Sequence, residues 1–138
     1  MNAATKLKVC NRALGCILIL MLASGIQLEA TSGIYGWSVW LHIVLGLLLV
    51  ILSCYHIYHH YRLSNWFARF AKNRLVTTRI LWWTFLLTAI SGIAATVIWF
   101  DGFAHSSLGG VHGKIGFLMV AIAIVHAVRH RKHKRRMK

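Results

Sequence analysis

The chain of 138 residues is 58% hydrophobic, contains no proline and carries a formal net charge of +14. Its charged residues lie in blocks between long uncharged stretches, a pattern that excludes a soluble domain with charges spread over its surface. The same pattern argues against nucleic-acid binding, because the basic residues flank apolar stretches. Stretches of roughly 20 apolar residues match the ~30 Å hydrocarbon core of a bilayer at a helical rise of ~1.5 Å per residue.

Four transmembrane helices are predicted, in chain order, over about residues 9–28, 35–61, 79–100 and 108–130, followed by a basic tail over 129–138. The first apolar run is short, so Lys8 and Arg12 are expected to reach toward the lipid headgroups. Continuous apolar runs favour helices over barrel strands, whose side chains alternate. We therefore expect an all-α integral membrane protein, a four-transmembrane-helix up-down bundle that forms a single membrane domain over residues 1–138.

The first helix has a second interpretation, as a cleavable signal peptide, because a basic start precedes its apolar stretch. Residues 22–25, Leu-Ala-Ser-Gly, are a poor cleavage site. The internal repeat described below also includes this helix, so we expect it to belong to the fold.

The loop between the second and third helices has its own pattern. Apolar residues recur there at helical spacing opposite basic ones, which predicts a short helix in the membrane interface. Its apolar residues are Leu63, Trp66, Phe67 and Phe70. Such a helix would anchor the loop, and the alternative is that it borders a quinone pocket.

The distribution of charge predicts the topology. Fifteen of the 16 basic residues precede the first helix, lie between the second and third, or follow the fourth. If the helices alternate in direction, these segments share one side, which the positive-inside rule makes the cytoplasm. The two acids, Glu29 and Asp101, fall in the two opposite connections. We expect a multi-pass protein of the bacterial inner membrane with both termini cytoplasmic, and a basic tail that contacts anionic lipid.

The chain repeats itself. A shift of 67 positions brings Ser24-Gly25-Ile26 of the first helix onto Ser91-Gly92-Ile93 of the third. A shift of 70 aligns the second helix with the fourth, and the difference is absorbed in an outer loop, where added length costs little. The sequence therefore predicts two helical hairpins of one design. The pairs aligned by the shift of 70 are His42 with His112, Gly46 with Gly116, His56 with His126, and His60 with His130.

Histidine inside a membrane span is unfavourable and usually functional. His42 and His56 are 14 residues apart, as are His112 and His126. Fourteen residues are just under four helical turns, so both rings of a pair leave one face of the helix, about 21 Å apart along its axis. Two parallel helices would then form two level pairs of histidines, His42 with His112 near the outer surface and His56 with His126 near the inner one.

Two level pairs of imidazoles are the ligands for two haem irons, each saturated by two histidines and suited to electron transfer. The absence of Cys-x-x-Cys-His from the sequence points to haem b and not to covalent haem c. A zinc, copper or nickel site is the alternative, but two histidines are too few for a closed zinc site.

Other residues have candidate roles beside the haems. Gly46 and Gly116 lie one turn from the outer ligands, where a flat macrocycle needs backbone without side chains; close helix packing is the alternative. Lys114 is expected to pair with an outer haem propionate or to reach the headgroups. His60 and His130 are expected to contact a propionate or a quinone, and they are also alternative inner ligands, at a spacing of 18.

Three short motifs and their repeats extend over nearly the whole chain except the basic tail. They are Ser24-Gly25-Ile26, His42-x-x-x-Gly46 and His56-x-x-x-His60. In these short motifs the chain resembles the family of small bacterial flavinylation-associated cytochromes. The resemblance implies a four-helix diheme membrane cytochrome b that passes electrons to extracytoplasmic flavin-bearing partners. By that resemblance His42, His56, His112 and His126 are the ligand candidates.

The ligand spacing also resembles that of cytochrome b of the quinol-oxidising bc complexes, although this chain lacks the further helices that form their quinone sites. The chain has no recognisable flavin-attachment sequence, so any flavin would belong to a partner.

Three functions remain open from the sequence. The first is an electron-transfer subunit that carries electrons across the membrane between quinol or an inner donor and an outer, flavin-bearing or other redox acceptor. The second is a self-contained quinone-linked oxidoreductase that acts on an outer small molecule such as superoxide. The third is a haem-free metal or proton transport protein.

Overall fold

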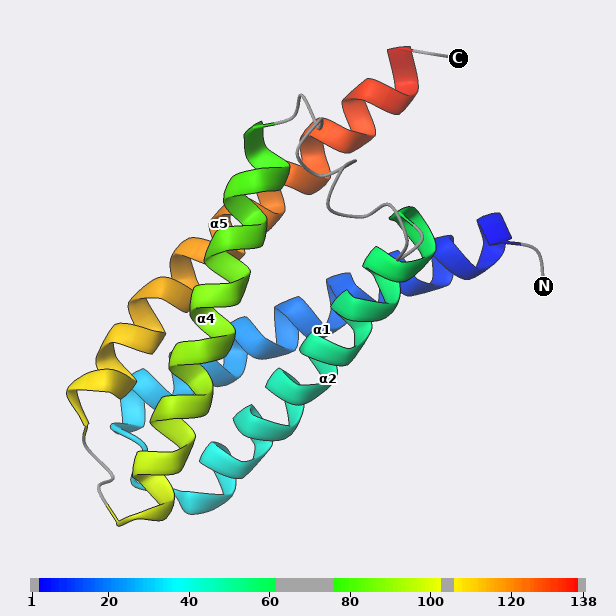
Figure 1. The fold of residues 1–138 in the computed structure, drawn as a ribbon. Coiled ribbons are helices and arrows are strands. Elements are labelled where there is room, and N and C mark those ends of the chain that lie inside the picture. The colour runs from blue at the N-terminus through cyan, green and yellow to red at the C-terminus, as the bar shows by residue number, and fades with distance from the viewer. Residues whose placement is uncertain (1–2, 62–75, 103–105, 137–138) are drawn as a thin grey trace. The chain divides into compact units, whose positions relative to one another are not determined.

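The computed structural model describes residues 3–61, 76–102 and 106–136, which form four helices (Figure 1). They are α1 (Ala3–Thr31), α2 (Gly36–Tyr61), α4 (Val76–Phe100) and α5 (Ser107–Arg136). Each of the four is long and apolar enough to cross a membrane, and these three ranges contain no strand. The prediction of an all-α, multi-pass membrane protein is therefore confirmed. The interfacial helix expected around residues 63–70 lies outside the described residues.

Three of the four helices are longer than their predicted ranges, whereas α2 keeps its predicted range to within one residue. α1 extends beyond the predicted 9–28 at both ends, α4 begins at Val76, and α5 continues through the basic tail to Arg136. The uncharged runs mark the part of each helix at hydrocarbon depth, and Lys and Arg are good helix formers beyond it. With no proline in the chain, nothing stops these helices at the predicted edges.

The chain divides into two compact units, Met1–Lys72 and Asn73–Lys138, each a helical hairpin that is described here by itself. In the first unit, Cys10 near the start of α1 lies 3.8 Å from the carbonyl oxygen of Leu52 near the end of α2, so the two helices are antiparallel. In the second unit, α4 and α5 run side by side in the same manner (Figure 1). The predicted pairing of the first helix with the second, and of the third with the fourth, is confirmed.

The first hairpin turns through a compact cap on α1. The amide of Gly33 donates to the carbonyl of Leu28 at 3.0 Å, and that of Ser32 to Glu29 at 3.3 Å, the hydrogen-bond pattern of a Schellman motif. Ser32 and Gly33 have φ angles of 50° and 65°. This left-handed backbone ends α1 and lets α2 begin at Gly36.

The second hairpin turns differently. Gly102, with φ of 90°, follows the end of α4, and the hydroxyl of Ser106 accepts a hydrogen bond from the amide of Gly109 at 3.1 Å. Ser106 therefore caps the start of α5. We call the end of each hairpin that carries its connection (residues 32–35 or 101–106) the loop end, and the opposite end the open end.

Most large apolar side chains on the helices are exposed, as helices that face lipid require. Ile93 is 68% exposed and Ile19 is 67% exposed. Two of the residues that are buried are polar, Ser24 at 5% exposure and Ser38 at 1%. A hydroxyl in such apolar surroundings needs hydrogen-bond partners. One of the hydrogen-bond partners of Ser24 is a candidate histidine, His42.

Candidate functional site

Near the loop end of the first hairpin, a serine of α1 meets a histidine of α2. The hydroxyl oxygen of Ser24 lies 2.8 Å from Nδ1 of His42. The same hydroxyl donates to the carbonyl of Met21 at 3.0 Å. When its single proton is donated to Met21, the serine oxygen can only accept from Nδ1–H of the ring. In that tautomer Nε2 carries the lone pair of the imidazole.

The second hairpin brings the equivalent residues together. The hydroxyl oxygen of Ser91 lies 3.2 Å from Nδ1 of His112 and donates to the carbonyl of Thr88 at 3.1 Å. Nδ1 of His112 also lies 3.1 Å from that carbonyl oxygen. A carbonyl can only accept, so Nδ1 of His112 bears the proton and Nε2 bears the lone pair.

Glycines of α1 and α4 allow these rings to approach the neighbouring helix. A Cβ atom at Gly25 would lie 3.7 Å from Cε1 of His42, an ordinary contact. At Gly92 it would lie 2.9 Å from Cε1 and 3.3 Å from Nδ1 of His112, too close for a side chain. The Ser-Gly pair on the first helix of each hairpin, α1 or α4, therefore forms the surface that the imidazole ring contacts.

A third contact is found within each hairpin at equivalent positions. A Cβ atom at Gly46 would lie 3.8 Å from Cε of Met21, and one at Gly116 would lie 3.9 Å from Cγ2 of Thr88. Three contacts are therefore found at equivalent positions of the two hairpins, as aligned by the shifts of 67 and 70. They are the contact of serine with histidine, that of glycine with histidine, and that of the second glycine with Met21 or Thr88. The packing of a haem against Gly46 and Gly116 stays a prediction.

The histidines nearer the open ends have other surroundings. In the second hairpin, Oγ1 of Thr78 lies 3.5 Å from Nδ1 of His126, the long limit for a hydrogen bond. The rings of His126 and His130 lie 5.2 Å apart and are tilted by 58°. In the first hairpin, Nδ1 of His56 is buried. His60 belongs to α2, but its side chain lies outside the described residues.

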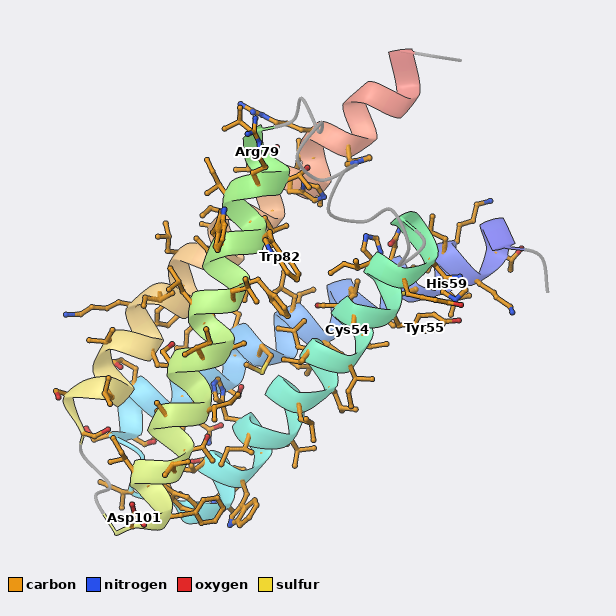
Figure 2. The ribbon with its side chains drawn as sticks, viewed as in Figure 1. Cys54, Tyr55, His59, Arg79, Trp82 and Asp101 are labelled. Atoms are coloured by element: carbon orange, nitrogen blue, oxygen red, sulfur yellow. The ribbon has the colours of Figure 1, made fainter. Side chains whose placement is uncertain are left out.

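His59 lies on another part of the α2 surface. Its ring packs edge-on against Tyr55 at 4.3 Å and Tyr58 at 5.3 Å, and Figure 2 shows Tyr55 and His59 beside each other near the open end. This histidine was not a ligand candidate, so it offers a matched control on the same helix as His42 and His56.

Lys114 is exposed and follows His112 by two residues in α5. Two residues turn an α-helix by about 200°, so Lys114 leaves α5 on the side away from His112. The expected pairing of Lys114 with a propionate of the outer haem stays a prediction, and this geometry makes contact with lipid headgroups the simpler role.

Two residues that contact the candidate histidines were not singled out from the sequence. Ser24 and Ser91 were visible only as part of a repeated Ser-Gly-Ile motif, and no role was assigned to their hydroxyls. The signal that could have found them is the coincidence of that motif with the histidine repeat at the same membrane depth.

Within the described ranges, no three His, Cys, Asp or Glu side chains gather as a metal-ion site would require. Comparison of the chain with known protein families, with characterised proteins and with solved structures finds no match. Function is therefore inferred from the residues of the chain itself and from their contacts.

Proposed function

We propose that the chain is a membrane-embedded diheme b-type cytochrome that carries electrons across the bacterial cytoplasmic membrane. His42 and His112 would bind one iron, and His56 and His126 the other. The observation that carries the proposal is the support of His42 and His112 by a Ser-Gly pair, found in the same register in both hairpins.

The donor atoms fit this cofactor. Iron-ligating histidines use a neutral imidazole whose second nitrogen donates a hydrogen bond to a fixed acceptor. The Ser91 and Thr88 oxygens at Nδ1 of His112 supply such acceptors, and Ser24 supplies one at His42. Bound haem would supply one-electron redox chemistry, and two imidazoles would hold each iron.

The spacing along each helix supports transfer across the membrane. His42 and His56 lie in one continuous helix, α2, and His112 and His126 lie in another, α5. The separation of 14 residues between the two histidines of one helix corresponds to about 21 Å along its axis. Two redox centres at these depths of a ~30 Å hydrocarbon layer would lie near its opposite surfaces.

The charges support an orientation. The open ends carry the basic residues at the start of α1 and the end of α5, and the loop ends carry Glu29 and Asp101. We place both termini in the cytoplasm on this basis. Electrons would pass between quinol or another inner donor and an extracytoplasmic acceptor, such as a flavin-bearing protein.

The direct test is the haem content and the reduced-minus-oxidised spectrum of detergent-purified protein. We expect two low-spin haems per chain in the wild type. Single replacement of His42, His56, His112 or His126 by Ala should remove one haem, because an iron loses an axial ligand. His59→Ala should retain both. A colourless wild type from cells well supplied with haem, or equal loss in His59→Ala, would contradict the proposal.

Double variants test how the ligands are shared. His42→Ala with His112→Ala should remove one haem, because both histidines serve the same iron. His42→Ala with His56→Ala should remove both, because each iron then loses a ligand. Loss of both haems from the first combination would show that the proposed pairing is wrong.

A further inference from the structure

We infer that Ser24 and Ser91 are positioning residues: their oxygens fix the Nδ1–H tautomer of His42 and His112, and they lower the reduction potential of the haem that these histidines hold. This inference rests on the proposed function. It assigns a role to two hydroxyls inside the membrane spans, and it makes a separate statement about redox properties.

The serines do not need the histidines in order to satisfy their own protons. Each hydroxyl donates to the carbonyl three residues earlier in its helix, Met21 for Ser24 and Thr88 for Ser91. Such bonds to the preceding turn are common for serine in apolar helices. The approach of the imidazole to the remaining lone pairs of the oxygen is therefore an additional interaction, which back-bonding alone does not require.

The serine oxygens are strong acceptors for a hydrogen bond from the imidazole. A hydroxyl that donates to a carbonyl is polarised, and its oxygen becomes a better acceptor in a medium of low dielectric constant. Ser24 is only 5% exposed, and its oxygen lies 2.8 Å from Nδ1 of His42. Little water competes for this bond.

The hydrogen bond at Nδ1 acts on the opposite nitrogen of the ring. An acceptor at Nδ1–H fixes the tautomer and the ring orientation and raises the basicity of Nε2. A more basic imidazole ligand would favour ferric over ferrous iron, so it would lower the reduction potential of the haem. Removal of the acceptor should therefore raise the potential.

The two serines should differ in effect. Ser24→Ala removes an acceptor at 2.8 Å from His42. Ser91→Ala removes one at 3.2 Å from His112 and leaves the Thr88 carbonyl at 3.1 Å from the same Nδ1. Because the Ser24 oxygen lies closer to its histidine than the Ser91 oxygen does, the shift in potential should be larger for Ser24→Ala.

The experiment is a potentiometric titration of the purified full chain with its haems. We expect Ser24→Ala to raise the potential of one haem and leave the other near its wild-type value, with a smaller rise in Ser91→Ala. Ser24→Thr keeps the hydroxyl and should return the potential toward that of the wild type. Ser24→Cys, of similar size but a weaker acceptor, should give an intermediate rise and serves if Ser24→Ala does not fold.

Two controls remove hydroxyls that do not meet a histidine. Ser38 donates to the Tyr35 carbonyl at 2.7 Å, and Thr96 donates to the Gly92 carbonyl at 2.8 Å. Ser38→Ala and Thr96→Val should leave both potentials unchanged. An equal rise in these controls would mean a general effect of polarity and would overturn the inference.

A spectroscopic readout is independent of the potential. In the reduced, diamagnetic protein, the Nδ1–H proton resonance of His42 should move upfield and exchange faster in Ser24→Ala, because its hydrogen bond is lost. Retention of both haems with unchanged potentials and an unchanged Nδ1–H signal would overturn the inference and leave the proposed function standing. A wild type without haem would instead contradict the proposed function, and histidine ¹⁵N spectra of that same full chain would still decide the tautomer.

Discussion

The two hairpins hold equivalent histidines in the same register, but the ring of His112 lies closer to its facing glycine than the ring of His42 does. The Ser24 oxygen lies 2.8 Å from Nδ1 of His42, and the Ser91 oxygen and the Thr88 carbonyl oxygen lie 3.2 and 3.1 Å from Nδ1 of His112. A repeated design can therefore preserve which positions meet while changing how closely they meet. The histidine repeat alone does not reveal that difference.

The distances to the facing glycines show this difference. The ring of His112 lies so near α4 that a Cβ atom at Gly92 would overlap it, whereas a Cβ atom at Gly25 would make an ordinary contact with His42. In the second hairpin this nearer ring also lies within hydrogen-bond distance of a backbone carbonyl, that of Thr88.

The largest expected difference comes from adding a methyl group at these two glycines. Gly92→Ala places Cβ 2.9 Å from the His112 ring, so the ring must move and one haem should be lost. Gly25→Ala places Cβ at 3.7 Å and should keep both haems. Haem per chain after purification measures the contrast, and the expected strain at Gly92 is about 1–3 kcal/mol.

Gly113→Ala is the control for helix propensity, because a Cβ atom there meets nothing within 4 Å. Replacing glycine by alanine inside a helix is itself favourable by up to about 1 kcal/mol. If Gly25→Ala and Gly92→Ala lose haem equally, the closer fit of the second hairpin has no functional consequence.

A smaller effect is expected at Gly46 and Gly116. Within their own hairpins, a Cβ atom at either position makes only ordinary contacts, at 3.8 and 3.9 Å. Alanine should therefore leave the hairpins intact, as judged by helical circular dichroism. If a haem packs on these glycines, Gly46→Ala and Gly116→Ala should each lower the occupancy of one haem in part. Full occupancy in both would assign the glycines to helix packing.

The smallest effect is expected from Thr78→Val. Its hydroxyl lies 3.5 Å from Nδ1 of His126, so its loss should change the potential of that haem less than Ser91→Ala changes the other. Thr84→Val, on the same helix, removes a hydroxyl that bonds the carbonyls of Ile80 and Leu81 and serves as the control. A shift larger than that of Ser91→Ala would place strong support at the open ends as well.

The fold was largely predictable because a long uncharged run has few other interpretations. Four helices and their pairing follow from the runs and the repeat, whereas the helix ends do not, since Lys and Arg continue a helix beyond the hydrocarbon. α5 shows this most clearly, because it reaches Arg136 through residues predicted as a tail.

The candidate site was predictable in part. The spacing of His42 and His56 and its repetition singled out the histidines. Ser24 and Ser91 were missed because a serine in an apolar helix is usually bonded to its own preceding turn, which both of them also are. Their contact with the histidines depends on which face α1 turns toward α2 and α4 turns toward α5, which the periodicity of a single helix does not determine.

Lys114 distinguishes the two hairpins during membrane insertion, because each hairpin carries one acid near its loop end but only the second also carries a basic residue there. Glu29 lies in the last turn of α1, and Asp101 follows α4, where it is exposed (Figure 2). In the proposed orientation each hairpin moves one carboxylate outward, which an inside-negative membrane potential favours by about 2.3 kcal/mol per charge at 100 mV. In the second hairpin, Lys114 must cross as well and offsets this electrical work. In that orientation the membrane potential would assist the insertion of the first hairpin and act little on that of the second.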